Sequence, residues 1–212
     1  MKEFKNVFIF DHPLIRHKVA ILRDEKTGMK EFRELVEEIT TLMTYESMRN
    51  VKTVAVQVKT PLETTTQYKV PEQSIVIVPI LRAGLGMVNG IHTLFPTAKV
   101  GHIGMYRNEE TLQPVEYYCK LPDGIEDKTV FLIDPMLATG GSACDAISAL
   151  KKRGVKDIKL MSIIGVPEGV TKVAEAHPDV DIYVSTLDRC LNENGYILPG
   201  LGDAGDRLFG TK

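Results

Sequence analysis

The chain has 212 residues, with 26 basic and 28 acidic side chains and a formal net charge of -2. This length fits one large domain with a sizeable core, and the near-neutral charge argues against a dominant nucleic-acid surface. The opening MKEFKNVFIFDHP does not resemble a signal peptide, and no apolar run approaches the roughly 20 residues that span a bilayer. The three cysteines show no metal-ligand spacing. We therefore expect a single domain over 1–212, located in the cytoplasm, with neither membrane nor nucleic acid as a partner.

The N-terminal third is expected to hold one long helix followed by two strands. Between Met29 and Arg49, apolar residues recur at helical spacing, with acidic residues mostly on the other side. The segment TVAVQVK, residues 53–59, alternates as a half-buried strand does, and Pro61 ends it. The polar, β-favouring segment ETTTQYKV, residues 63–70, is predicted to be a projecting or edge strand.

From Ser74 onward, short apolar runs alternate with helical stretches. The runs SIVIVPIL, KVGHIGMY, TVFLID, IKLMSIIGV and DIYVSTL are predicted strands, several of them buried on both faces. The helical stretches lie at residues 86–95, 142–153 and 169–176. This alternation predicts an α/β fold, a mostly parallel twisted sheet flanked by helices, with its core at about 74–190. Ligands bind such sheets beyond the carboxyl ends of the strands.

One strand-to-helix turn is unusually stripped of side chains. The apolar run at 130–133 stops at Asp134 and is followed by PMLATGGS. Two glycines let backbone N–H groups approach an anion, the helix N-terminus favours negative charge, and Thr139 and Ser142 can add hydroxyl donors. The loop matches neither the Walker A motif nor the dinucleotide fingerprint. Taken alone, it is explained equally well by an anion cradle or by a tight turn with Ser142 as helix cap.

Three motifs, in the expected order, resemble those of the type I phosphoribosyltransferases. These enzymes transfer ribose 5-phosphate from 5-phosphoribosyl 1-diphosphate to a nitrogenous base. DPMLATGGS, residues 134–142, resembles their ribose-phosphate loop, with Pro135 in place of a second acid, as in the uracil phosphoribosyltransferases. PILRAGLGM, residues 79–87, resembles the diphosphate-binding loop, and GYILPGLGDAGDRLFGT, residues 195–211, resembles the uracil-binding C-terminus. The similarity covers essentially the full chain.

The resemblance implies a donor site with four catalytic residues, Arg82, Arg107, Asp134 and Asp203. Arg82 and Arg107 would bind the diphosphate. Without the motif, a lone arginine after a strand such as Arg82 is more often part of a surface ion pair, and Arg107 would belong to a solvated turn. Asp134 would accept hydrogen bonds from the ribose hydroxyls rather than simply begin a helix. Arg107 also opens a polar loop between two β-favouring stretches, which is typical of a hairpin that acts as a lid. Further donor contacts are implied at Pro135, Met136, Leu137, Ala138, Thr139, Gly140, Gly141 and Ser142.

The resemblance also implies a uracil pocket lined by Ile197, Gly202, Asp203 and Ala204. Its many glycines are typical of a flexible tail, but the segment carries too many large apolar residues for a solvated one. Backbone N–H and C=O groups would recognise the base edges, so a cytosine amino group would leave buried groups unpaired. Together with the N-terminal segment, residues 191–212 are expected to form a small hood.

The expected function is transfer of ribose 5-phosphate to N1 of uracil, giving UMP and diphosphate in pyrimidine salvage. Mg²⁺ would be bound mainly through the donor's own oxygens, with no firm protein ligand. Three alternatives remain: an RNA-binding regulator on the same fold, a phosphoribosyltransferase for orotate or a purine, and a non-catalytic nucleotide-binding domain. The polar β-arm near Thr64–Thr66 favours a homodimer or larger homo-oligomer, and some relatives suggest GTP as an effector. His12, His92 and His102 are interpreted as structural.

Overall fold

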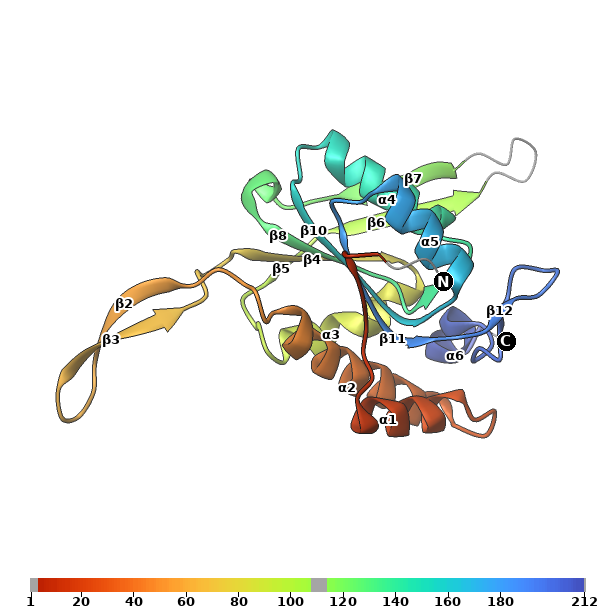
Figure 1. The fold of residues 1–212 in the computed structure, drawn as a ribbon, viewed down its shortest axis with the longest axis horizontal. Coiled ribbons are helices and arrows are strands. Elements are labelled where there is room, and N and C mark those ends of the chain that lie inside the picture. Colours follow the sequence, from red (N-terminus) through yellow and green to blue (C-terminus); the bar gives the residue numbers. More distant parts are fainter. Residues whose placement is uncertain (1–3, 108–113, 212) are drawn as a thin grey trace.

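The computed structural model describes residues 4–107 and 114–211. Its central sheet has the strand order β1-β11-β10-β8-β4-β6-β7, and every neighbouring pair is parallel except β6 and β7 (Figure 1). The short strands β5 and β9 pair with β4 and β10. The strands are β1 (Val7–Ile9), β4 (Ile75–Leu81), β5 (Lys99–Val100), β6 (His102–Arg107), β7 (Pro114–Lys120), β8 (Thr129–Ile133), β9 (Met136–Leu137), β10 (Asp157–Gly165) and β11 (Asp181–Leu187).

Helices cover both faces of this sheet, as its continuously apolar strands require. One face packs against α4 (Gly141–Lys152) and α5 (Pro167–Ala176). The other packs against α1 (Pro13–Arg23), α2 (Met29–Ser47), α3 (Val88–His92) and α6 (Ala204–Phe209). The two layers lie on opposite sides of the sheet in Figure 1. The predicted α/β fold with a mostly parallel sheet is therefore confirmed.

The predicted helices are found, with one difference. The stretches at 29–49, 142–153 and 169–176 correspond to α2, α4 and α5. The stretch at 86–95 is not one continuous helix. A 3₁₀ turn, Ala83–Met87, leads into α3, which spans only Val88–His92. Glycines at 84, 86 and 90 pack without room for a Cβ, so close packing rather than helical propensity shapes this segment.

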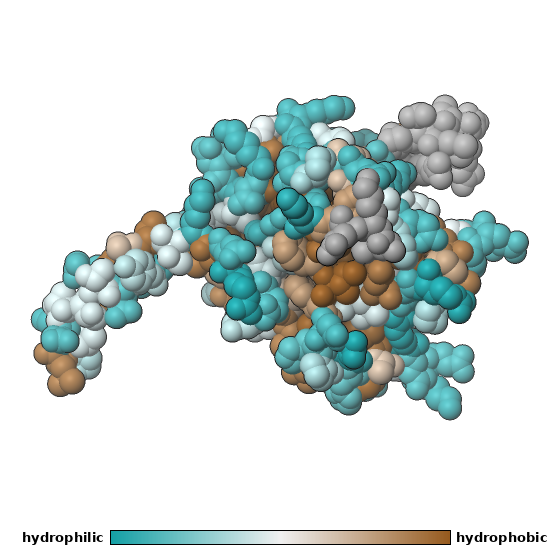
Figure 2. All heavy atoms as spheres, in the orientation of Figure 1, coloured by the Kyte–Doolittle hydropathy of each residue, from teal (hydrophilic) through white to brown (hydrophobic). Residues whose placement is uncertain are grey.

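The two strands before the sheet form a separate arm. β2 (Val54–Lys59) pairs antiparallel with β3 (Thr64–Lys69) in a two-stranded sheet that projects from the body (Figure 1). The projecting strand is confirmed, and the half-buried alternation expected for 53–59 is found at Val56 and Val58, whereas Val54 is 46% exposed. The arm's tip carries Leu62, 95% exposed, and hydrophobic atoms are visible there in Figure 2. An alternating pattern indicates that one face of a strand is apolar, but it does not indicate which part of the molecule covers that face.

The glycine-rich C-terminus is folded. β12 (Cys190–Leu191) and β13 (Ile197–Leu198) form a small hairpin, and α6 follows. Ile197, Leu201 and Leu208 are buried in the core layer shared with α1 and α2. Within the described ranges, no helix combines the length and apolar character needed to cross a bilayer.

Candidate active site

Loops from four parallel strands meet at one edge of the sheet. β4, β8, β10 and β11 run in the same direction, so the segments that follow them lie at the same edge. These segments begin at Arg82, Asp134, Val166 and Asp188. Two of the three predicted motifs, at 79–87 and 134–142, extend into these segments, and the third, at 195–211, continues the segment that begins at Asp188.

The glycine-rich loop after β8 presses directly on the start of α5. Gly140 has φ +73°, and a Cβ there would lie 2.8 Å from the carbonyl oxygen of Gly169. A Cβ on Gly169 would lie 2.2 Å from the carbonyl oxygen of Ala138. Both positions therefore exclude any side chain. The loop encloses a cavity of about 80 Å³, lined by Asp134, Met136, Leu137, Ala138, Thr139, Gly140, Gly141, Ser142, Ala143 and Ser162.

The two explanations of this loop differ in what caps α4. The residue before the helix is Gly140, and within the described part of the chain no side chain accepts a hydrogen bond as its cap. Ser142 lies inside the first turn and is exposed. The first backbone N–H groups are thus without a capping side chain, apart from a long 3.4 Å contact from the Gly141 N–H to the Thr139 hydroxyl. That arrangement favours an anion site over a serine cap.

Asp134 is a carboxyl group in an unfavourable setting. Burial raises its pKa to about 7 and outweighs the opposing effect of the 3.4 Å hydrogen bond donated by the Met136 backbone N–H. The negative charge of Asp203 raises the pKa further. The structure therefore brings a residue of the β8 loop close to one of the C-terminal segment. A partly exposed acid whose pKa is strongly perturbed, at a strand's carboxyl end, is typical of a functional site.

Arg82 lies beside the C-terminal helix. Its side chain is 58% exposed, and its Nη2 is 3.8 Å from the Asp206 carboxylate in α6. Such a long, exposed ion pair contributes little stability, so the guanidinium remains available to a ligand. The following loop packs closely against β8, since a Cβ on Gly84 would lie 2.4 Å from the carbonyl oxygen of Ile133. The peptide bond between Leu81 and Arg82 is cis.

The predicted uracil segment faces this same edge. Asp203 begins α6, and its side chain accepts a 2.9 Å hydrogen bond from the Asp206 N–H. Ile197 and Ala204 are buried, whereas Gly202 and Asp203 are exposed. A Cβ on Gly205 would lie 3.2 Å from the Asp203 carboxylate and 3.8 Å from the Arg82 guanidinium. Asp134, Arg82 and Asp203 thus come from three elements to one place.

Arg107 is the predicted site residue about which the structure says least. Its backbone ends β6, which pairs in parallel with β4 and antiparallel with β7. The antiparallel pairing agrees with the expected hairpin. The predicted lid residues 108–113 lie outside the described residues, so the lid stays a prediction.

Three residues near the loop were not identified from the sequence. Gly169 supports the loop, and Lys172 in α5 places its Nζ 3.8 Å from where a Cβ on Gly141 would be. Ser162 is 1% exposed and lines the cavity, and its hydroxyl has no hydrogen-bond partner within the described part of the chain. A glycine shortly after a strand is a detectable signal. Lys172 and Ser162 lie near the loop only because of tertiary packing, for which the sequence carries no local signal.

Metal ligands and histidines add no further site. Across 4–107 and 114–211, no group of three or more His, Cys, Asp or Glu side chains is placed to hold a metal ion. His92 contacts the carbonyl oxygen of Ala98 at 3.1 Å, and the His12 ring accepts a hydrogen bond from the Leu14 N–H. Both contacts agree with structural roles.

Comparisons with known proteins agree with these motifs. The family model described as uracil phosphoribosyltransferase matches residues 9–211. Relatives named uracil phosphoribosyltransferase from Clostridium beijerinckii and Clostridium acetobutylicum are 60% identical over 206 residues and 62% identical over 201 residues. These matches cover 97% and 95% of this chain and 99% and 96% of the relatives.

Solved structures show the same fold. The AQ2163 protein from Aquifex aeolicus is similar with a TM-score of 0.91 at 38% identity, covering 97% of this chain and 99% of that one. An adenine phosphoribosyl transferase from Trypanosoma brucei has a TM-score of 0.60 at 14% identity, over 96% and 90% of the two chains, which shows a common fold alone. Both the sequence matches and the fold lead to one conclusion: the chain belongs to the uracil phosphoribosyltransferase family.

Proposed function

We propose that this protein transfers ribose 5-phosphate from 5-phosphoribosyl 1-diphosphate to N1 of uracil, giving UMP and diphosphate in pyrimidine salvage. One observation carries the proposal: the glycine-rich loop, Asp134 and the C-terminal segment with Asp203 meet at the carboxyl edge of the sheet. A phosphate-binding element and a base-binding element are therefore adjacent, as a nucleotide product requires.

The donor's 5-phosphate binds at the first turn of α4 and the loop that leads into it. Backbone N–H groups of Thr139 to Ser142 and the helix dipole stabilise the phosphate. Asp134 accepts hydrogen bonds from the 2′- and 3′-hydroxyls of the ribose, and Arg82 and Arg107 bind the diphosphate. Pro135 to Ala138, which lie between Asp134 and Thr139 in the sequence, shape the loop around the sugar. The cavity beside Asp134 and the exposed guanidinium of Arg82 support this placement.

Uracil lies against the C-terminal segment, with Ile197, Gly202, Asp203 and Ala204 around it. Gly202 has φ +82°, which turns its backbone groups away from an ordinary extended path. Polar backbone groups beside the buried Ile197 and Ala204 suit a small planar base with an apolar face and polar edges. The site discriminates against cytosine, because the cytosine amino group would leave buried hydrogen-bonding groups of the pocket unpaired.

The reaction is a substitution at the anomeric carbon of the sugar. A bond forms between that carbon and uracil N1, the bond to the diphosphate oxygen breaks, and the N1 proton is released. The leaving diphosphate takes the electron pair, and Arg82 and Arg107 stabilise its charge. The chain contributes mainly by holding the two substrates in line.

Mg²⁺ is the cofactor that this chemistry calls for, bound mainly through the donor's oxygens. The local donor set fits a hard cation, because Asp134 and Asp203 both offer carboxylate oxygens and the charge of Asp203 acts on Asp134. When bound, Mg²⁺ neutralises part of the diphosphate charge.

Other properties rest on weaker grounds. A homodimer or larger homo-oligomer is supported by the projecting β2–β3 arm with its exposed Leu62 and Tyr68. A GTP effector and a cytoplasmic location rest on the family resemblance and composition alone.

The proposal is tested by supplying the donor and Mg²⁺ with uracil, cytosine, orotate or hypoxanthine in separate reactions and chromatographing the nucleotides. UMP should form, with at most traces of other products. Product from orotate or hypoxanthine without UMP would contradict the assigned base. An Arg82→Ala variant should lose most of the turnover, whereas Lys120→Ala, at the far end of β7, serves as a matched loss of a cation.

A further inference from the structure

A nearly buried ion pair joins the first helix to the end of β11. Arg23 is the last residue of α1, and Asp188 follows β11. The Arg23 guanidinium donates two hydrogen bonds to the Asp188 carboxylate, at 2.8 and 2.5 Å. The side chains are 21% and 4% exposed. This is the bidentate geometry in which an arginine–carboxylate pair is both strong and directional.

The pair also holds the backbone of Gly200 from both sides. The Gly200 N–H donates a 2.9 Å hydrogen bond to the Asp188 carboxylate, and its carbonyl oxygen accepts a 2.7 Å hydrogen bond from Arg23. Both polar groups of one glycine are thus bound to the two partners of one ion pair. Gly200 has φ +63°, and a Cβ there would lie 2.2 Å from the carbonyl oxygen of Ile197.

Gly200 lies between the two parts of the proposed uracil pocket. Ile197 precedes it by three residues, and Gly202 follows it by two. Downstream, the Arg207 side chain donates hydrogen bonds to the carbonyl oxygens of Leu22 and Leu201, at 2.9 and 3.0 Å. Arg23 and Arg207 therefore each bind the C-terminal segment to the end of α1. Of the two, the Arg23–Asp188 pair contacts the turn at Gly200 directly.

We infer that Arg23 and Asp188 are positioning residues for uracil: through Gly200 they set where the backbone groups of 197–204 meet the base. This inference rests on the proposed function, because it presumes that this segment binds uracil. Neither side chain needs to touch the base. Loosening the turn should weaken uracil binding while leaving the donor's phosphate site, on a different loop, unchanged.

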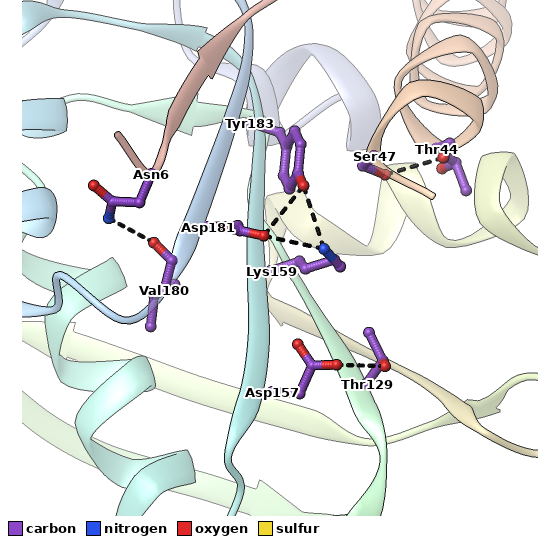
Figure 3. A network of polar contacts seen from close by, with 9 residues as sticks. All are labelled: Asn6, Thr44, Ser47, Thr129, Asp157, Lys159, Val180, Asp181 and Tyr183. Atoms are coloured by element: carbon purple, nitrogen blue, oxygen red, sulfur yellow. Dashed lines mark hydrogen bonds and ion pairs between the residues drawn. The ribbon is translucent and has the colours of Figure 1, made fainter. Parts of the chain in front are cut away.

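The opposite end of β11 offers a matched control. Asp181 begins the strand and accepts a 3.2 Å hydrogen bond from Lys159, which also contacts the Tyr183 hydroxyl at 3.2 Å (Figure 3). The Lys159 side chain is 9% exposed. In this pair the lysine is the buried partner and the Asp181 side chain is 40% exposed, and the pair lies at the amino end of the strand. Breaking it should cost stability without reaching the site.

The kinetic test compares the full-length wild type with Arg23→Gln, Asp188→Asn and the control Lys159→Met, each well below its melting temperature. For Arg23→Gln and Asp188→Asn, the KM for uracil should rise about tenfold or more, because small misplacements weaken binding strongly. The KM for the donor should stay within about twofold, and the double variant should do little more than the worse single one, because the pair acts as a unit. Lys159→Met should change neither KM. An unchanged uracil KM, or an equal rise in the control, would overturn the inference.

Backbone amide hydrogen exchange provides a readout that does not depend on activity. In Arg23→Gln and Asp188→Asn, amides between 198 and 204 should exchange faster, whereas those of α4 should not. Unchanged protection of the Gly200 region would refute the positioning role even if activity falls. Failure of the wild type to make UMP would instead refute the proposed function and leave the exchange result to decide the role of the pair. Because two variants probe one turn, loss of folding in one leaves the test intact.

Discussion

At the scale of single residues, Asp134 destabilises the folded protein when it is ionised, and it is also the proposed acceptor for the ribose hydroxyls. Its pKa is raised from 3.8 to about 7, first by burial and then by the charge of Asp203. The carboxyl group therefore binds its proton more strongly in the folded chain than in the unfolded chain. Its contribution to the free energy of unfolding is most favourable below pH 4 and declines as the pH rises through 7. A residue that destabilises the free protein when ionised is typically kept for binding.

Replacing Asp134 by Asn should stabilise the free protein at pH 8 by up to about 4 kcal/mol, since each pKa unit corresponds to about 1.4 kcal/mol. The gain should shrink as the pH falls from about 7 toward 4, because there the folded carboxyl is protonated and the unfolded one is only about half ionised. Urea unfolding of both proteins between pH 4 and 8 measures this difference. A gain that does not depend on pH would contradict the burial of an ionisable carboxyl group. Asp203→Asn should move the wild-type midpoint to lower pH, because it removes the neighbouring negative charge.

Lys172 allows a second test at this scale. Its Nζ lies near Gly141, beside the proposed 5-phosphate site, but the side chain is exposed. Lys172→Gln should raise the KM for the donor by about threefold to tenfold at low salt, with a smaller effect at high ionic strength because exposed charges are screened. Lys152→Gln, near the other end of α4, is the control. An effect on uracil KM alone would show that Lys172 does not serve the phosphate.

At the scale of elements, the site depends on glycines that let backbones touch. The loop before α4 rests on the first turn of α5 through Gly140 and Gly169. The sequence predicted both helices and the loop, because apolar periodicity and glycine placement are local signals. It did not predict this contact, which depends on how the two crossover connections pack on one face of the sheet.

Gly169→Ala should displace the loop, because the new methyl group would meet the Ala138 carbonyl oxygen at 2.2 Å. The KM for the donor should rise about tenfold or more, since the phosphate-binding N–H groups would shift. Gly28→Ala is the control, because a Cβ there meets no atom of the described residues within 4 Å. Normal donor kinetics in Gly169→Ala, with a normal melting temperature, would show that the contact does not hold the loop.

At the scale of the whole molecule, the projecting arm is the feature that an isolated chain explains least. Two-stranded hairpins are marginal on their own, yet this arm exposes Val54, Leu62 and Tyr68 at 46%, 95% and 72%. The alternation of valines predicted the strand correctly, and its half-buried side is limited to Val56 and Val58. A second copy of the chain would cover these residues and explain the same pattern.

Replacing residues 54–69 by a short Gly-Ser linker should therefore lower the molecular mass measured by light scattering, from a dimer or larger assembly to a monomer. Leu62→Glu should act in the same direction, because it places a charge at the arm's apolar tip. An unchanged mass for both variants would remove the arm from the interface.

The alternation of apolar runs and helical stretches predicted the fold, and the three motifs predicted which segments would lie near one another. Arg82, Asp134 and Asp203 were identified from three separate segments, and the structure brings them to one edge of the sheet. The positions of Ser162 and Lys172, and the tie from Arg23 to Gly200, could not be predicted. They depend on contacts between residues far apart in sequence, for which a single chain carries no local pattern.

The central claim is that one edge of the sheet binds both halves of a nucleotide, and a crystal structure with UMP tests it most directly. The phosphate should lie on the backbone N–H groups of Gly140 to Ser142, with the ribose hydroxyls at Asp134. The uracil edge should meet the backbone between Ile197 and Ala204. A phosphate bound elsewhere, or a uracil ring turned away from the C-terminal segment, would contradict the account.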